Sequence, residues 1–162
     1  AGIMGATMHI ATHAFGKITL FFCAGAILVS TRRSRISELA GIGRSMPWTM
    51  GAFAIASLAM IGLPPTAVFV SKWFILSGAV DAGQMLAVTV LLLSTLLTAG
   101  YLLPVVYTAF FEAPGKPGND THEEAPPAIL LALAVTTLGT LVLFFFPGLL
   151  LALASQLAGS GA

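Results

Sequence analysis

Long apolar stretches occupy most of this sequence and leave little room for a soluble domain. They cover residues 3–29, 46–80, 84–111 and 127–146. A helix needs about 20 apolar residues to cross the hydrocarbon core of a bilayer, and each stretch reaches that length. Of the 162 residues, 57% are hydrophobic and 8% are charged. We therefore predict an all-α integral membrane protein with about four transmembrane helices in one membrane domain, 1–162.

The second stretch is too long for one straight helix. Its ~35 residues would extend about 52 Å, whereas the hydrocarbon core is about 30 Å thick. Gly62, Pro64 and Pro65 interrupt it, and each proline removes a backbone N–H and clashes with the preceding turn. We expect the helix to be discontinuous at 62–65, which frees the carbonyl groups of Met60 and Ile61.

Arginines gather in the loop at residues 30–45, where four of them face one acid, Glu38. Short loops rich in Arg and Lys stay on the cytoplasmic side of a membrane, so we expect loop 30–45 to be cytoplasmic. A net charge of +1 gives no surplus of basic residues for nucleic acid. The expected surroundings are the lipid bilayer and other membrane helices.

The chain begins with Ala-Gly-Ile, without an initiator Met or the basic segment of a signal peptide. We expect it to be the C-terminal part of a longer subunit, with further helices upstream. The sequence has no phosphate-binding glycine loop and no Cys/His zinc pattern. We predict no cofactor and no bound metal.

Three ionisable side chains interrupt the first stretch: His9, His13 and Lys17. We call them the polar ladder. Their i, i+4, i+8 spacing keeps them on one helix face. Ionisable groups inside a membrane span are costly and usually mark proton or ion paths, which makes the ladder a candidate proton relay. The alternative is that His9 lies near the membrane surface and bonds a carbonyl of a neighbouring helix.

Lys72 follows the interruption and allows two interpretations. Beside Trp73 it resembles an interfacial anchor whose ammonium reaches the lipid headgroups. Apolar sequence continues to Val80, however, which favours a lysine inside the membrane next to a broken helix, as in many transporters. The residues alone leave both interpretations open.

Two further functions remain open on the residues alone. Histidines at i and i+4 can chelate a metal, so His9 and His13 would suit a divalent metal permease. The polar side chains could also merely pair between the helices of a non-conducting scaffold subunit.

Several segments together resemble a known family. Residues 8–25 follow the pattern H-x3-H-A-x2-K and L-F-x2-A-G, and residues 38–47, 61–66 and 70–73 continue the likeness. The pattern resembles that of the antiporter-like subunits, which are shared by Mrp-type Na⁺/H⁺ antiporters and respiratory complex I with its subunits L, M and N. Residues 94–107 look more like the corresponding Mrp antiporter protein than like a complex I protein.

The resemblance implies the end of a larger subunit in a multisubunit complex of the bacterial inner membrane. Such a subunit translocates protons, or exchanges a monovalent cation such as Na⁺ for protons. It counts as a translocating enzyme only within a complex I-like NADH dehydrogenase. By resemblance His9, His13 and Lys17 belong to the relay and Lys72 is the lysine of the broken helix. The glutamate and lysine of the family's first half-channel lie outside this sequence.

Overall fold

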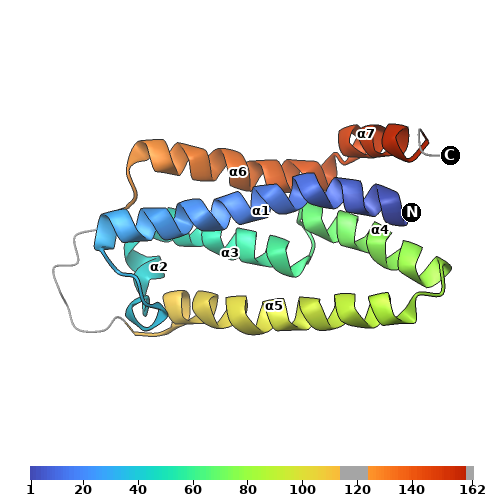
Figure 1. The fold of residues 1–162 in the computed structure, drawn as a ribbon. Helices are drawn as coiled ribbons and strands as arrows, with labels where there is room; N and C mark the ends of the chain where they lie inside the picture. Colours follow the sequence, from blue (N-terminus) through green and yellow to red (C-terminus); the bar gives the residue numbers. More distant parts are fainter. Residues whose placement is uncertain (114–123, 160–162) are drawn as a thin grey trace.

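The computed structural model describes residues 1–113 and 124–159 of the chain. Within these ranges every regular element is helical (Figure 1), which confirms the all-α prediction. The elements are α1 (Gly2–Thr31), the 3₁₀ turn η1 (Ile36–Glu38), α2 (Ile42–Ser45), α3 (Pro47–Ile61), α4 (Ala67–Asp81), α5 (Met85–Phe111), α6 (Pro127–Phe145) and α7 (Gly148–Gly159). By length and composition, α1, α5 and α6 can each cross a membrane.

The remaining crossing is the discontinuous helix that the sequence predicts. α3 ends at Gly62, whose φ of 87° lies in the left-handed region, and α4 begins after Thr66, whose backbone is extended. The Pro64–Pro65 peptide bond is cis. Each half has 15 residues, a length of about 22 Å. Neither half spans a bilayer alone, so the two together make the crossing.

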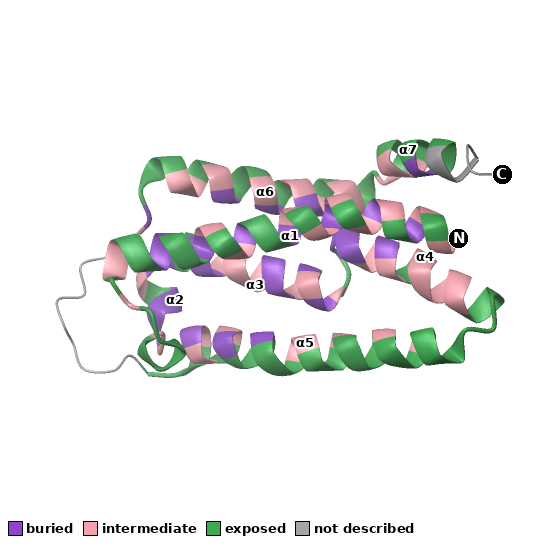
Figure 2. Ribbon diagram, viewed as in Figure 1, coloured by how far each residue is buried: buried purple, intermediate pink, exposed green. Residues whose placement is uncertain are grey.

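The helices run roughly along one axis, with α1 in the middle of the bundle. Figure 1 shows α6 on one side of α1, α3 and α4 in succession on the other, and α5 beyond them. Buried residues face the contacts among these helices, whereas most of α5 is exposed (Figure 2). Small residues allow the close packing, because a Cβ on Gly5 of α1 would lie 2.6 Å from the backbone nitrogen of Ile75 in α4.

A carboxylate from a distant segment closes the start of α3. Its N-cap residue, Met46, offers no side-chain hydrogen bond, which leaves donors at the first turn without partners. Glu124, just before α6, accepts hydrogen bonds from the backbone N–H of Trp48 at 3.0 Å and from the hydroxyl of Thr49 at 2.5 Å. The negative charge also suits the positive end of the helix dipole. Glu124 thereby ties the α5–α6 connection to α3.

Candidate functional site

The two histidines of the polar ladder lie side by side in the structure. Their ring centroids are 5.1 Å apart, with planes tilted by 35°, and both side chains are partly buried. Lys17 follows near the middle of α1, but its side chain is exposed. The structure therefore brings His9 and His13 together and leaves Lys17 on an open face of the described chain.

A hydroxyl of α4 joins the ladder to the broken helix. Ser71 Oγ lies 2.9 Å from His9 Nδ1 and 3.2 Å from Thr12 Oγ1, and it donates to the carbonyl of Val68 at 3.0 Å. Ser71 and Thr12 are both fully buried. His9 therefore bonds a side chain of a neighbouring helix rather than a backbone carbonyl, the partner that the alternative interpretation expected.

Lys72 lies against the interruption between α3 and α4. Its Nζ donates to the carbonyls of Ile61 at 2.8 Å and Met60 at 3.3 Å, and to Thr95 Oγ1 of α5 at 3.2 Å. An ammonium has three donors, and three acceptors meet it here. The carbonyls belong to the last turn of α3, the negative end of that helix. This geometry is that of a lysine bound at a helix break, not of one that extends to the lipid headgroups.

Two contributors to this site were not predicted from the sequence. Ser71 directly precedes Lys72, so its position in the chain is a signal, but which helix its hydroxyl faces is not. Thr95 is one of several hydroxyl residues along α5, and nothing in its spacing distinguishes it. Contacts between helices alone identify both residues.

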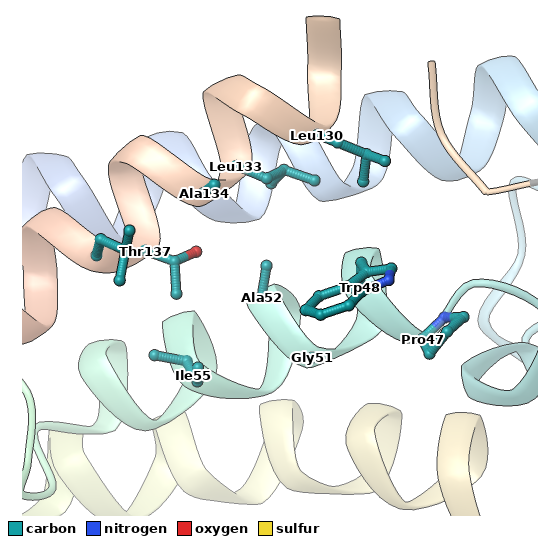
Figure 3. Close-up of a pocket in the computed structure, with 10 residues that line it drawn as sticks. Pro47, Trp48, Gly51, Ala52, Ile55, Leu130, Leu133, Ala134 and Thr137 are labelled. Carbon is teal, nitrogen blue, oxygen red and sulfur yellow. The ribbon is translucent and has the colours of Figure 1, made fainter. Parts of the chain in front are cut away.

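The largest described cavity lies away from these residues. It measures about 620 Å³ between α3 and α6, and its walls are apolar apart from Thr137 (Figure 3). Its lining residues are Pro47, Trp48, Gly51, Ala52, Ile55, Leu130, Leu133, Ala134, Thr137 and Leu138. Within residues 1–113 and 124–159, no three His, Cys, Asp or Glu side chains gather as a metal site.

A bundle of apolar helices that holds a lysine at the ends of a discontinuous helix defines an integral membrane protein of the broken-helix type. The chain belongs to the family described as NADH:quinone oxidoreductase/Mrp antiporter, transmembrane, which matches residues 1–98. The matched part contains the polar ladder, the interruption, Lys72 and Thr95. The family resemblance drawn from the sequence is thereby confirmed.

Relatives in sequence include subunits of NADH-quinone oxidoreductases. Subunit N from Desulforudis audaxviator is 39% identical over 155 residues, which cover 89% of this chain and 31% of that protein. Subunit L from Mycobacterium tuberculosis is 36% identical over 152 residues, which cover 88% of this chain and 24% of that protein. The chain thus spans about a third or less of the curated relatives it matches.

Two solved structures share the fold. The Mrp complex from Dietzia sp. matches with a TM-score of 0.83 over 94% of this chain and 36% of that one, at 21% identity. Respiratory complex I from Thermus thermophilus matches with a TM-score of 0.70 over 90% and 34%, at 26% identity. The likeness to the Mrp structure concerns the fold alone, so the closer resemblance of residues 94–107 to the Mrp antiporters stays a prediction.

Proposed function

We propose that the intact subunit moves protons across the membrane, alone or in exchange for a monovalent cation such as Na⁺. In this proposal His9, His13 and Lys17 pass charge along the membrane interior. Lys72 exchanges a proton with one membrane face. The observation that carries the proposal is the ammonium of Lys72 held by the carbonyls of Met60 and Ile61 inside a broken membrane helix.

The partners of Lys72 suit reversible protonation. Carbonyl and hydroxyl dipoles stabilise an ammonium less strongly than a carboxylate does. In the part of the chain that the structure describes, the hydrogen-bond partners of Lys72 are two carbonyls and one hydroxyl. Loss of the proton leaves no unpaired carboxylate behind, which lowers the cost of alternating between the two charge states.

The exposed Lys17 supports a path that continues beyond the described helices. A charged side chain near the middle of a membrane helix is costly when it faces lipid. Lys17 is exposed near the middle of α1. We propose that further helices or enclosed water of the intact subunit cover this face and extend the relay.

The proposed setting is a hetero-oligomeric complex in a bacterial inner membrane, with loop 30–45 cytoplasmic. The arginines of that loop support the orientation, and the α5–α6 connection lies at the same end of the bundle (Figure 1). Relatives named as subunits of NADH-quinone oxidoreductase and of F420H2 dehydrogenase support membrane partners.

Replacement of Lys72 tests the proposal. We expect Lys72→Ala in the full-length subunit to abolish coupled proton movement in inverted membrane vesicles, measured with a pH-sensitive dye, while the complex still assembles. Trp73→Phe on the same helix is the matched control, because Trp73 is 60% exposed, and it should keep full transport. Unchanged proton movement in the alanine variant would overturn the proposal.

The two other functions give different results in the same vesicles. A scaffold subunit would keep proton movement after neutral replacement of His9, His13, Lys17 and Lys72 together. A metal permease would take up a divalent cation in a manner that depends on His9 and His13.

A further inference from the structure

We infer that Ser71 is a positioning residue that keeps a proton on Nδ1 of His9, so that Nε2 alone exchanges protons. The inference deepens the proposed function, because it assigns one ring nitrogen to the relay. It stands on the hydrogen bonds between α1 and α4. The group that would exchange a proton with Nε2 is water or a neighbouring side chain.

The argument begins with the single hydrogen of the Ser71 hydroxyl. Three polar atoms surround Ser71 Oγ: the Val68 carbonyl at 3.0 Å, His9 Nδ1 at 2.9 Å and Thr12 Oγ1 at 3.2 Å. The carbonyl can only accept. If Ser71 donates to Val68, its oxygen accepts from both His9 Nδ1–H and Thr12, and three bonds form.

The opposite arrangement forms fewer bonds. If Ser71 donates to a bare His9 Nδ1, it no longer donates to Val68, and only the bond from Thr12 remains beside the new one. Ser71 and Thr12 are each 0% exposed, so bulk water does not replace a lost partner. A buried hydrogen bond left unmade is costly, and the arrangement with Nδ1–H is the one with all three bonds.

The assignment restricts how His9 handles a proton. The neutral ring carries its proton on Nδ1 and a lone pair on Nε2. Nε2 takes up a proton to form the imidazolium, and the same nitrogen releases it, since Nδ1 stays bonded to Ser71. His9 therefore takes up and returns a proton at one nitrogen. Ser71 precedes Lys72 on α4, which couples the orientation of this ring to the position of the broken helix.

Nitrogen-15 NMR of labelled histidine in the full-length subunit, reconstituted in its complex, tests the assignment. The difference from the spectrum of His9→Gln isolates the His9 signals, and bare and protonated ring nitrogens have well separated shifts. At a pH where the ring is neutral, we expect the Nδ1–H tautomer in the unmodified protein. A dominant Nε2–H tautomer there would overturn the inference, without need of any Ser71 variant.

Substitutions then test whether Ser71 is the cause. We expect Ser71→Ala to lower the Nδ1–H to Nε2–H ratio about tenfold, as loss of one hydrogen bond implies, and Ser71→Thr to keep it. Ser77→Ala is the matched control: Ser77 donates to the carbonyl of Phe74 at 3.2 Å on the same helix and should leave the ratio unchanged. An unchanged ratio in Ser71→Ala, or an equal change in Ser77→Ala, would contradict the inference.

The tautomer ratio and the transport of Lys72→Ala fail independently. A shifted ratio together with normal transport in Lys72→Ala would retain the role of Ser71 and remove the proposed function. An unshifted ratio together with abolished transport would do the reverse.

Discussion

The side chain of Lys72 lies directly against the backbone of Gly62. A Cβ atom at position 62 would come within 2.6 Å of Lys72 Cδ and 3.3 Å of its Nζ. Gly62 also ends α3 with a φ of 87°, a conformation that other residues adopt at a cost. The same glycine thus ends the helix and leaves the space through which the lysine reaches the carbonyls of Met60 and Ile61.

Gly62→Ala should therefore displace Lys72 and impair transport. The left-handed conformation alone costs about 1–2 kcal/mol for a residue with a Cβ, and the clash with Lys72 adds to it. We expect a lower unfolding temperature of the complex and reduced proton movement in vesicles. Gly51→Ala is the control on the same helix, because a Cβ there meets no atom within 4 Å. Equal behaviour of the two variants would contradict this account.

Thr95 should matter through its hydroxyl rather than its shape. Thr95→Val keeps the volume but removes the acceptor for Lys72 Nζ at 3.2 Å. A hydrogen bond between membrane helices contributes about 1 kcal/mol, so we expect proton movement to slow roughly fivefold, whereas Thr95→Ser should retain it. Thr98→Val provides the comparison, since Thr98 donates only to the Ser94 carbonyl of its own helix. A threonine-to-valine effect of similar size at both positions would point to packing instead.

Glu124 should stabilise the bundle by capping α3 from outside that helix. Glu124→Ala leaves the N–H of Trp48 and the hydroxyl of Thr49 without their acceptor, and loss of a helix cap costs about 1–2 kcal/mol. We expect earlier unfolding in a denaturing-detergent titration. Glu112→Ala should have no measurable effect, because Glu112 is exposed and accepts only from Thr108, at 3.3 Å. Unaltered unfolding of the Glu124 variant would rule out the cap.

The loop at Glu38 should lose order in acid. Hydrogen bonds from the backbone N–H groups of Arg35 and Ser34 lower the pKa of the Glu38 carboxyl below its ordinary value. The carboxylate's contribution is therefore complete above the ordinary carboxyl pKa of about 4.3 and is lost as the pH falls through the lowered value. Amide hydrogen exchange at residues 34 and 35, corrected for intrinsic rates, should accelerate in that range. Glu38→Ala should abolish this transition.

Much of the helix layout follows from local features of the sequence. The lengths of the apolar stretches predict where helices lie, because a membrane crossing requires about 20 residues. The break at Gly62, Pro64 and Pro65 is equally local, since a proline lacks its N–H wherever the helix packs. The ladder spacing places His9 and His13 on one face for the same reason.

The partners of these residues depend on how the helices pack. Ser71 meets His9 from 62 positions away, and Lys72 meets Thr95 from 23 positions away. In a soluble helix, polar and apolar faces indicate which side is buried. In a membrane helix both the lipid face and the packed face are apolar, so the rotation of each helix about its axis does not follow from the sequence pattern. The sequence alone therefore determined the crossings, the break and the positions of the ionisable residues, whereas the tertiary structure alone decided which hydroxyls and carbonyls face them.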